Sequence, residues 1–121
     1  MAHNRQDIKN FHIGQKATLV INVEDENGDA VNMTGGEAVL TVMPKDDFGK
    51  KTSNVDALLQ KSVGQGIEIT DPSAGKLEVT FEPSDTEDLK HITRWYRIDV
   101  TDSEDNPMPG AVAGNFELVH N

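Results

Sequence analysis

Four histidines could bind a metal ion or transfer protons in this chain. A metal site needs several ligands that converge on one point, and a short repeat such as H-x-x-x-H achieves this on one element. No two of the four are spaced in this way; they are His3, His12, His91 and His120. We therefore expect exposed histidines and no metal site built on them.

Two acidic loops, residues 25–29 and 102–106, offer oxygen atoms that could bind calcium. Calcium takes about six to eight oxygen ligands, and the first loop has Gly28 where an EF-hand loop needs a ligand and no glutamate that closes it. Asp, Asn and Gly are also the residues that tight hairpin turns require for local reasons. We expect two turns, and calcium binding stays an alternative if the loops meet at one end of the fold.

Nucleophilic and carbohydrate-cleaving chemistry lack their usual residue patterns. No serine lies in a G-x-S-x-G elbow, and the chain contains no cysteine, so neither a thiolate nucleophile nor a disulfide can form. Paired carboxylates could serve a glycosidase, but such sites bring several aromatic platforms, and the chain has one tryptophan and one tyrosine. We predict no enzymatic activity, no catalytic residue and no cofactor.

The charge balance limits the partners of this 121-residue chain, whose 21 acidic and 11 basic residues give a net charge of −10. Nucleic acids and anionic membrane surfaces both require clustered basic residues, so neither is an expected partner. The acidic surface favours solubility or docking onto a basic protein. Residues 1–15 contain no apolar run, so we expect neither a signal peptide nor a membrane span there.

The elements that position any site are short strands, because apolar and polar residues alternate along most of the chain. This alternation is clearest in residues 16–24, 37–43, 66–70, 76–81, 95–101 and 111–119. The segment 55–63 fits a helix or a strand, and we favour a strand at 58–62. The link 71–75, DPSAG, is typical of a tight hairpin connection.

This pattern predicts an all-β fold. We expect an Ig-like antiparallel β-sandwich of seven to eight short strands, with one short helical turn near residues 84–90. A small closed barrel is the structural alternative. Residues 1–12 are expected to form a flexible N-terminal arm, in which Ile8 and Phe11 could begin a short strand, and residues 13–121 a single domain.

The adjacent Trp95 and Tyr96 must point to opposite faces of their strand. Tyr96 shares its face with Ile98 and Val100, so we expect it to be buried, with its hydroxyl bonded to loop backbone as in a tyrosine corner. Trp95 then shares the outer face with Arg97. It is either a partly covered surface residue or an interface anchor, a role in which tryptophan is enriched.

Four residues are predicted to contact a protein partner. Trp95 and Arg97 lie on the outer face of one strand, Phe48 stands alone in the polar loop 45–54, and Phe11 belongs to the N-terminal arm. An arm of this kind could become ordered on a partner.

The order of these motifs resembles a family of small Ig-like β-sandwich proteins of tailed bacteriophages, similar to the N-terminal domain of baseplate upper proteins. The resemblance covers about residues 13–119. It rests on the alternation Ile67 and Ile69, the turn Asp71 to Gly75, the strand 77–81, Asp85-Thr86 before Leu89, the strand 96–102, and the segment 19–35 with its Asn-Gly turn and Thr-Gly. The chain departs from the family in lacking a glycine before the aromatic strand and in its longer loop 45–54.

The resemblance implies a non-enzymatic structural component of a tailed phage virion. Such a protein would act in the tail, baseplate or neck, or as capsid decoration, and would assemble with other virion proteins in several symmetric copies. It would be made in the host cytoplasm and reside in the virion. The alternative is a carbohydrate- or receptor-binding module of a surface protein, which predicts a patch of exposed aromatic residues.

Overall fold

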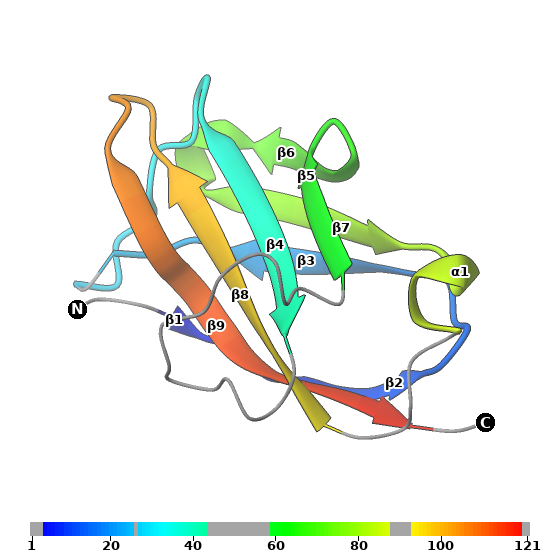
Figure 1. Cartoon of the computed structure of the whole chain (residues 1–121). Helices are drawn as coiled ribbons and strands as arrows, with labels where there is room; N and C mark the ends of the chain where they lie inside the picture. The colour runs from blue at the N-terminus through cyan, green and yellow to red at the C-terminus, as the bar shows by residue number, and fades with distance from the viewer. Residues whose placement is uncertain (1–3, 26, 44–58, 88–92, 120–121) are drawn as a thin grey trace.

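The computed structural model describes residues 4–25, 27–43, 59–87 and 93–119, and within them the fold is all-β, as predicted (Figure 1). The described strands form a mixed sheet of nine, in the order β1-β9-β8-β4-β5-β6-β7-β3, and β2 also pairs with β9. The strands are β1 (Asn4–Arg5), β2 (Ile8–His12), β3 (Ala17–Asn22), β4 (Glu37–Met43), β5 (Leu59–Val63), β6 (Gly66–Asp71), β7 (Lys76–Phe81), β8 (Thr93–Thr101) and β9 (Pro107–Val119). Two short helical turns, η3 (Pro72–Ala74) and α1 (Pro83–Thr86), complete the described elements.

The sheet curls on itself, so that β9, β8 and β4 cross in front of β7 and β3 (Figure 1). Most neighbouring strands are antiparallel, but β5 pairs with β6 in parallel, and β1 and β2 run parallel to β9. The expectation of a purely antiparallel sandwich is corrected here. Gly64 and Gly66, with φ of +86° and +105°, allow the sharp bend that carries the chain from one half of the sheet to the other.

The alternating apolar residues fill the space inside the curled sheet. The inner faces of β4, β7 and β8 are almost fully buried; they comprise Ala38, Leu40, Val42, Leu77, Val79, Phe81, Tyr96, Ile98 and Val100. Three phenylalanine rings from β2, β7 and β9 pack with centroid separations of 5.1 to 5.4 Å; they are Phe11, Phe81 and Phe116. Burial of each ring stabilises the fold by about 1.5–3 kcal/mol.

The predicted hairpin link at residues 71–75 is confirmed. It joins β6 and β7, which pair in antiparallel register, and it contains the turn η3. Gly75 ends this turn with φ of +66°, and a Cβ atom there would lie 2.6 Å from the carbonyl oxygen of Val23. Only glycine therefore fits, because both the backbone angle and the space exclude a side chain.

The expected flexible N-terminal arm is wrong for residues 4–12. Both β1 and β2 are strands paired with β9, with Arg5 opposite Ala113 and Ile8 opposite Phe116. Phe11 is 3% exposed and lies in the core. The segment is ordered because burying two apolar side chains and forming ladder hydrogen bonds offsets the entropy of fixing it.

A set of contacts that we call the N-terminal clamp fixes this segment where it crosses β9. The hydroxyl of Tyr96 donates to the carbonyl oxygen of Gln6, and the amide of Gln6 donates to Ala113 at 2.9 Å. The amide of Asn115 donates to Oδ1 of Asp7 at 2.9 Å. A Cβ atom on Gly114 would lie 2.8 Å from that same oxygen, so glycine permits the close crossing. The clamp consists of Gln6, Asp7, Tyr96, Ala113, Gly114 and Asn115.

Tyr96 is therefore buried, as predicted, but its hydroxyl partner differs from the predicted one. A tyrosine corner bonds to backbone a few residues upstream, whereas Gln6 lies 90 residues away in sequence. Burial raises the pKa of the Tyr96 phenol well above its usual value, and the negative charge of Asp7 raises it further. The hydroxyl consequently remains a proton donor to Gln6 at all ordinary pH values.

Candidate functional site

The structure does not gather the four predicted interaction residues into one patch. Trp95 and Arg97 are half-buried on the outer face of β8, and Nε of Arg97 lies 3.3 Å from Oδ2 of Asp99. Phe48 lies outside the described residues. Phe11 is corrected from a docking residue to a core residue, because its ring packs against other core rings and leaves no surface for a partner.

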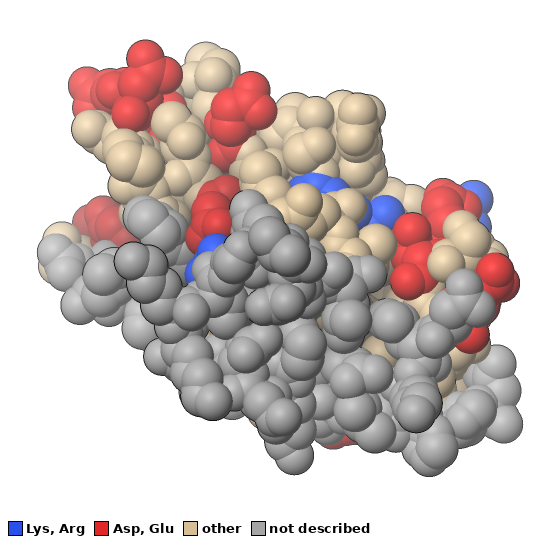
Figure 2. Space-filling view, viewed as in Figure 1, with Lys and Arg blue, Asp and Glu red and all other residues tan. Residues whose placement is uncertain are grey.

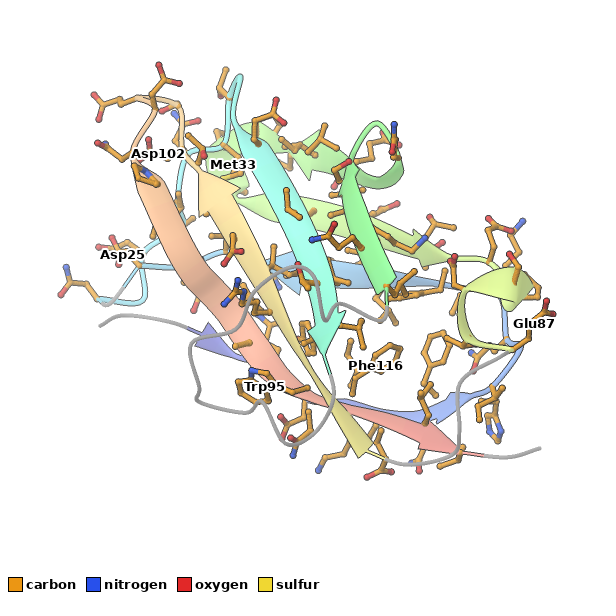
Figure 3. All side chains as sticks on the ribbon, in the orientation of Figure 1. Asp25, Met33, Glu87, Trp95, Asp102 and Phe116 are labelled. Atoms are coloured by element: carbon orange, nitrogen blue, oxygen red, sulfur yellow. The ribbon has the colours of Figure 1, made fainter. Side chains whose placement is uncertain are left out.

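The prediction of which β8 side chains point into the core is confirmed around Trp95 and Arg97. Tyr96, Ile98 and Val100 are buried on the inner face, whereas Trp95 and Arg97 lie on the opposite face. Figure 3 labels Trp95 on β8 where this strand runs beside β9, and the two strands pair along their length.

The two acidic loops are turns, as predicted, and the structure shows that they share one hydrogen-bond pattern. Oδ1 of Asp25 accepts the amides of Asn27 and Asp29 at 2.9 and 3.0 Å. Oδ1 of Asp102 accepts the amides two and four residues further on, each at 2.9 Å. The pattern I-x-V-x-D precedes both turns, at residues 21–25 and 98–102, and this short repeat was missed in the sequence.

These turns lie at the same end of the molecule, where acidic side chains gather (Figures 2 and 3). The amide of Ser103 donates to the carbonyl oxygen of Asn32 at 3.0 Å, which ties the second turn to the chain that follows the first. The carboxylates of Asp25 and Asp102 are occupied by their own backbone. Among the described residues, no group of three or more His, Asp or Glu side chains is arranged to hold a metal ion. The geometry thus gives these acids a local role in the turns.

The carboxylate of Asp102 is expected to make stability depend on pH. Hydrogen bonds from the amides of Asn106 and Glu104 lower the pKa of Asp102. Its folded-state pKa therefore lies below the unfolded value, so its contribution to stability is present above the ordinary aspartate pKa and is lost as pH falls through the folded value. We expect Asp102→Asn, which keeps a side-chain oxygen acceptor, to lower the urea midpoint at pH 7 but to match the unmodified chain at a pH below both values. A difference independent of pH would contradict this assignment.

The outer face of β3, β7 and β6 combines charged side chains with an exposed apolar side chain, Val20. We call it the β3–β7–β6 face; its outward side chains are Thr18, Val20, Asn22, Glu68, Thr70, Lys76, Glu78 and Thr80. Its members follow from the same alternation that buries the inner residues of these strands.

Register places two carboxylates directly opposite each other on the β3–β7–β6 face. Glu68 of β6 pairs with Glu78 of β7, and Val20 of β3 lies on the other side of Glu78. Like charges directly opposite on neighbouring strands are destabilising. Val20 is 51% exposed, a large value for an apolar side chain in a strand. Sequence alternation predicted that each residue points outward, but not that the three form one row.

A hollow of about 570 Å³ adjoins this row. It is lined by both glutamates, by Thr80, by Val63 at the β5–β6 bend and by Ile69 within β6. Lys76 is the cation of the same face, two residues from Glu78. Aliphatic walls beside two carboxylates can hold the stem and the charged end of a lysine or arginine side chain.

A smaller groove of about 260 Å³ separates β3 from the N-terminal segment. Its lining includes Ile8, Leu19, Val20 and Tyr96. β3 ends the order of paired strands, so one side of its backbone faces this groove. The side-chain amide of Gln6 bridges the groove at one end by donating to the carbonyl oxygen of Asn22 at 3.0 Å.

Comparison with protein-family models gives no match for this chain, and comparison with curated proteins gives none either. In the part of the chain that the structure describes, no helix has the length and apolar character needed to cross a membrane.

Proposed function

We propose that this chain is a non-enzymatic structural component of a tailed phage virion that docks onto another virion protein through its β3–β7–β6 face. The observation that carries the docking role is the row formed by the exposed Val20, the half-buried Glu78 and the exposed Glu68 on neighbouring strands. The virion assignment draws on the sequence resemblance to small Ig-like phage proteins.

The like-charge pair supports a basic partner. The repulsion between Glu68 and Glu78 is a cost that the isolated chain bears. A lysine or arginine from a partner would convert this repulsion into charge-assisted hydrogen bonds, and the partner would cover Val20 at the same time. The net charge of −10 would steer a basic surface toward this chain.

The end position of β3 supports assembly through the sheet edge. An edge strand presents unpaired backbone groups to which an extended segment of another chain can add. Because Asn22 uses its carbonyl oxygen toward Gln6, the carbonyl groups of Thr18 and Val20, at two-residue spacing, point the same way. Several copies docked in this manner would suit a ring or shell of virion proteins.

The distribution of aromatic residues gives less support to carbohydrate binding. Sugar-binding surfaces use exposed aromatic side chains as platforms, whereas Phe11, Phe81, Tyr96 and Phe116 are buried and Trp95 is half-buried. Among the described residues, the large apolar side chain that stands exposed is Val20. An aliphatic residue between polar neighbours favours a protein partner over a sugar.

Particle composition tests this proposal. Phage particles would be assembled in cells that supply this chain from a plasmid, and its copy number would be measured by quantitative mass spectrometry against the major capsid protein. We expect hundreds of copies for capsid decoration and at most a few dozen for a tail, baseplate or neck protein. Absence of the unmodified chain from the particle would overturn the virion assignment.

Charge reversal tests the docking face separately. Glu68→Lys combined with Glu78→Lys is expected to lower incorporation about tenfold or more, because it places two cations against a basic partner. Glu37→Lys combined with Glu104→Lys, at exposed acids outside the face, makes the same change in net charge and should leave incorporation unchanged. Equal incorporation of both double variants would exclude this face as the docking surface.

A further inference from the structure

We propose that residues 4–12 exchange between copies of this chain, so that β1 and β2 of one copy pair with β9 of a second copy. The partner is thus an identical chain, and the exchanged surface is the one that the segment already occupies within its own fold. This inference is independent of the virion assignment, because it concerns the purified chain alone.

The edge of β9 that lies opposite β8 pairs with this segment. The described backbone ladder of β1 and β2 runs along β9, with Asn4 opposite Val112 and Phe11 opposite Leu118. The ring of Phe11 fits between two other phenylalanines, each at a centroid distance of 5.1 Å. The N-terminal clamp adds hydrogen bonds at the crossing. Every one of these contacts is available to the same segment arriving from another copy.

A short link, residues 13–16, keeps the N-terminal segment paired with β9 of its own chain. Residues 13–16 connect β2 to β3, and these two strands pair with different neighbours, β9 and β7. The link turns tightly: the amide of Gln15 donates to the carbonyl oxygen of His12 at 3.0 Å, and Gly14 has φ of +82°. The amide of Gly14 donates to Oγ1 of the buried Thr86 at 2.9 Å. Opening this turn would break the hydrogen bond between Gly14 and Thr86, whereas the strand pairing of β1 and β2 with β9 ends at His12.

The free-energy balance favours exchange when the link is strained. The closed and exchanged forms share the strand pairing, the clamp and the packing of Phe11, so these contributions cancel. The free energies of the two forms then differ only through the conformation of residues 13–16 and the entropy that is lost when two chains join. Exchange should therefore increase with protein concentration and with any change that makes the Gly14 turn unfavourable.

Two single-cysteine variants test the exchange, since the chain has no cysteine of its own. His12 of β2 lies opposite Val119 of β9. His12→Cys and Val119→Cys would be unfolded together in urea, refolded as a concentrated mixture and joined with a short bifunctional thiol reagent. We expect a covalent heterodimer at least tenfold more abundant than from Glu104→Cys mixed with Val119→Cys, because Glu104 lies in the turn at residues 102–106. The control mixture measures cross-linking by random collision, and an equal yield from the two mixtures would overturn the proposal.

Proline substitution in the link provides a second, independent readout. Gly14→Pro cannot adopt φ of +82° and removes the amide that binds Thr86. We expect it to shift the molar mass measured by light scattering from one chain to two. Gly28→Pro is the matched control, because Gly28 has φ of +83° and also donates its amide, but it lies outside the link. It should stay a monomer, and a monomeric Gly14→Pro would contradict the exchange.

Discussion

Replacing Tyr96 with alanine is expected to lower the free energy of unfolding by about 3–5 kcal/mol, the cost of deleting a buried aromatic side chain. Tyr96 is fully buried on the inner face of β8, and its hydroxyl holds Gln6 in the N-terminal clamp. The substitution therefore leaves a cavity in the core and also releases β1 and β2 from β9. Urea unfolding followed by circular dichroism measures this loss.

Two variants separate the contributions of Tyr96. Tyr96→Phe keeps the ring and removes the hydroxyl, so it leaves the carbonyl oxygen of Gln6 without this donor, at a cost of about 1–3 kcal/mol. Trp95→Ala changes the neighbouring residue on the outer face and should cost much less than Tyr96→Ala. If Trp95→Ala destabilised the chain more than Tyr96→Ala, the assignment of the two faces of β8 would be inverted.

Replacing Lys61 with alanine is expected to destabilise the fold by about 3 kcal/mol, since it leaves a largely buried carboxylate without its cation. Nζ of Lys61 lies 2.8 Å from Oδ2 of Asp85, and the two side chains are only 9% and 18% exposed. The same carboxylate oxygen accepts the amide of Glu82 at 2.7 Å, which fixes the start of α1. Lys61 thus joins β5 to α1 across the end of the core.

An apolar replacement of similar length distinguishes the charge from the packing of Lys61. Lys61→Met combined with Asp85→Asn removes both charges but keeps a side-chain oxygen that can accept the amide of Glu82. It should cost less than Lys61→Ala, because no buried charge is left without its partner. Lys61→Ala alone should be the least stable of the series in urea unfolding. If the double variant were as unstable as Lys61→Ala, the ion pair itself would be the stabilising element.

The Lys61 pair and the N-terminal clamp act on opposite sides of the proposed docking surface. Lys61 lies beside the β5–β6 bend, where Gly66 packs against its side chain. Gln6 of the clamp bridges to the end of β3. Both sets of contacts therefore position strands that carry the β3–β7–β6 face, and variants in them must be checked for folding before their effect on assembly is interpreted.

Local chemistry in the sequence determined the all-β class, the facing of most strands and the turns. Two-residue alternation assigns inner and outer faces without knowledge of the partner strand, which is why Tyr96 was correctly placed inside and Trp95 outside. Turn residues act in the same local way: the two aspartates at the start of the acidic turns accept hydrogen bonds from backbone amides two and four residues further on.

Tertiary structure alone decided which strands pair and what each side chain meets. The parallel pairing of β2 with β9 joins segments from opposite ends of the chain, and it brings Phe11 of a largely polar N-terminal segment into the core. Lys61 occupies an inward position because Asp85, 24 residues away, supplies its counter-charge. The facing of Glu68 and Glu78 follows from the register of the β6–β7 hairpin, which shifts between Ile69 and Asp71 and which the alternation within either strand does not predict.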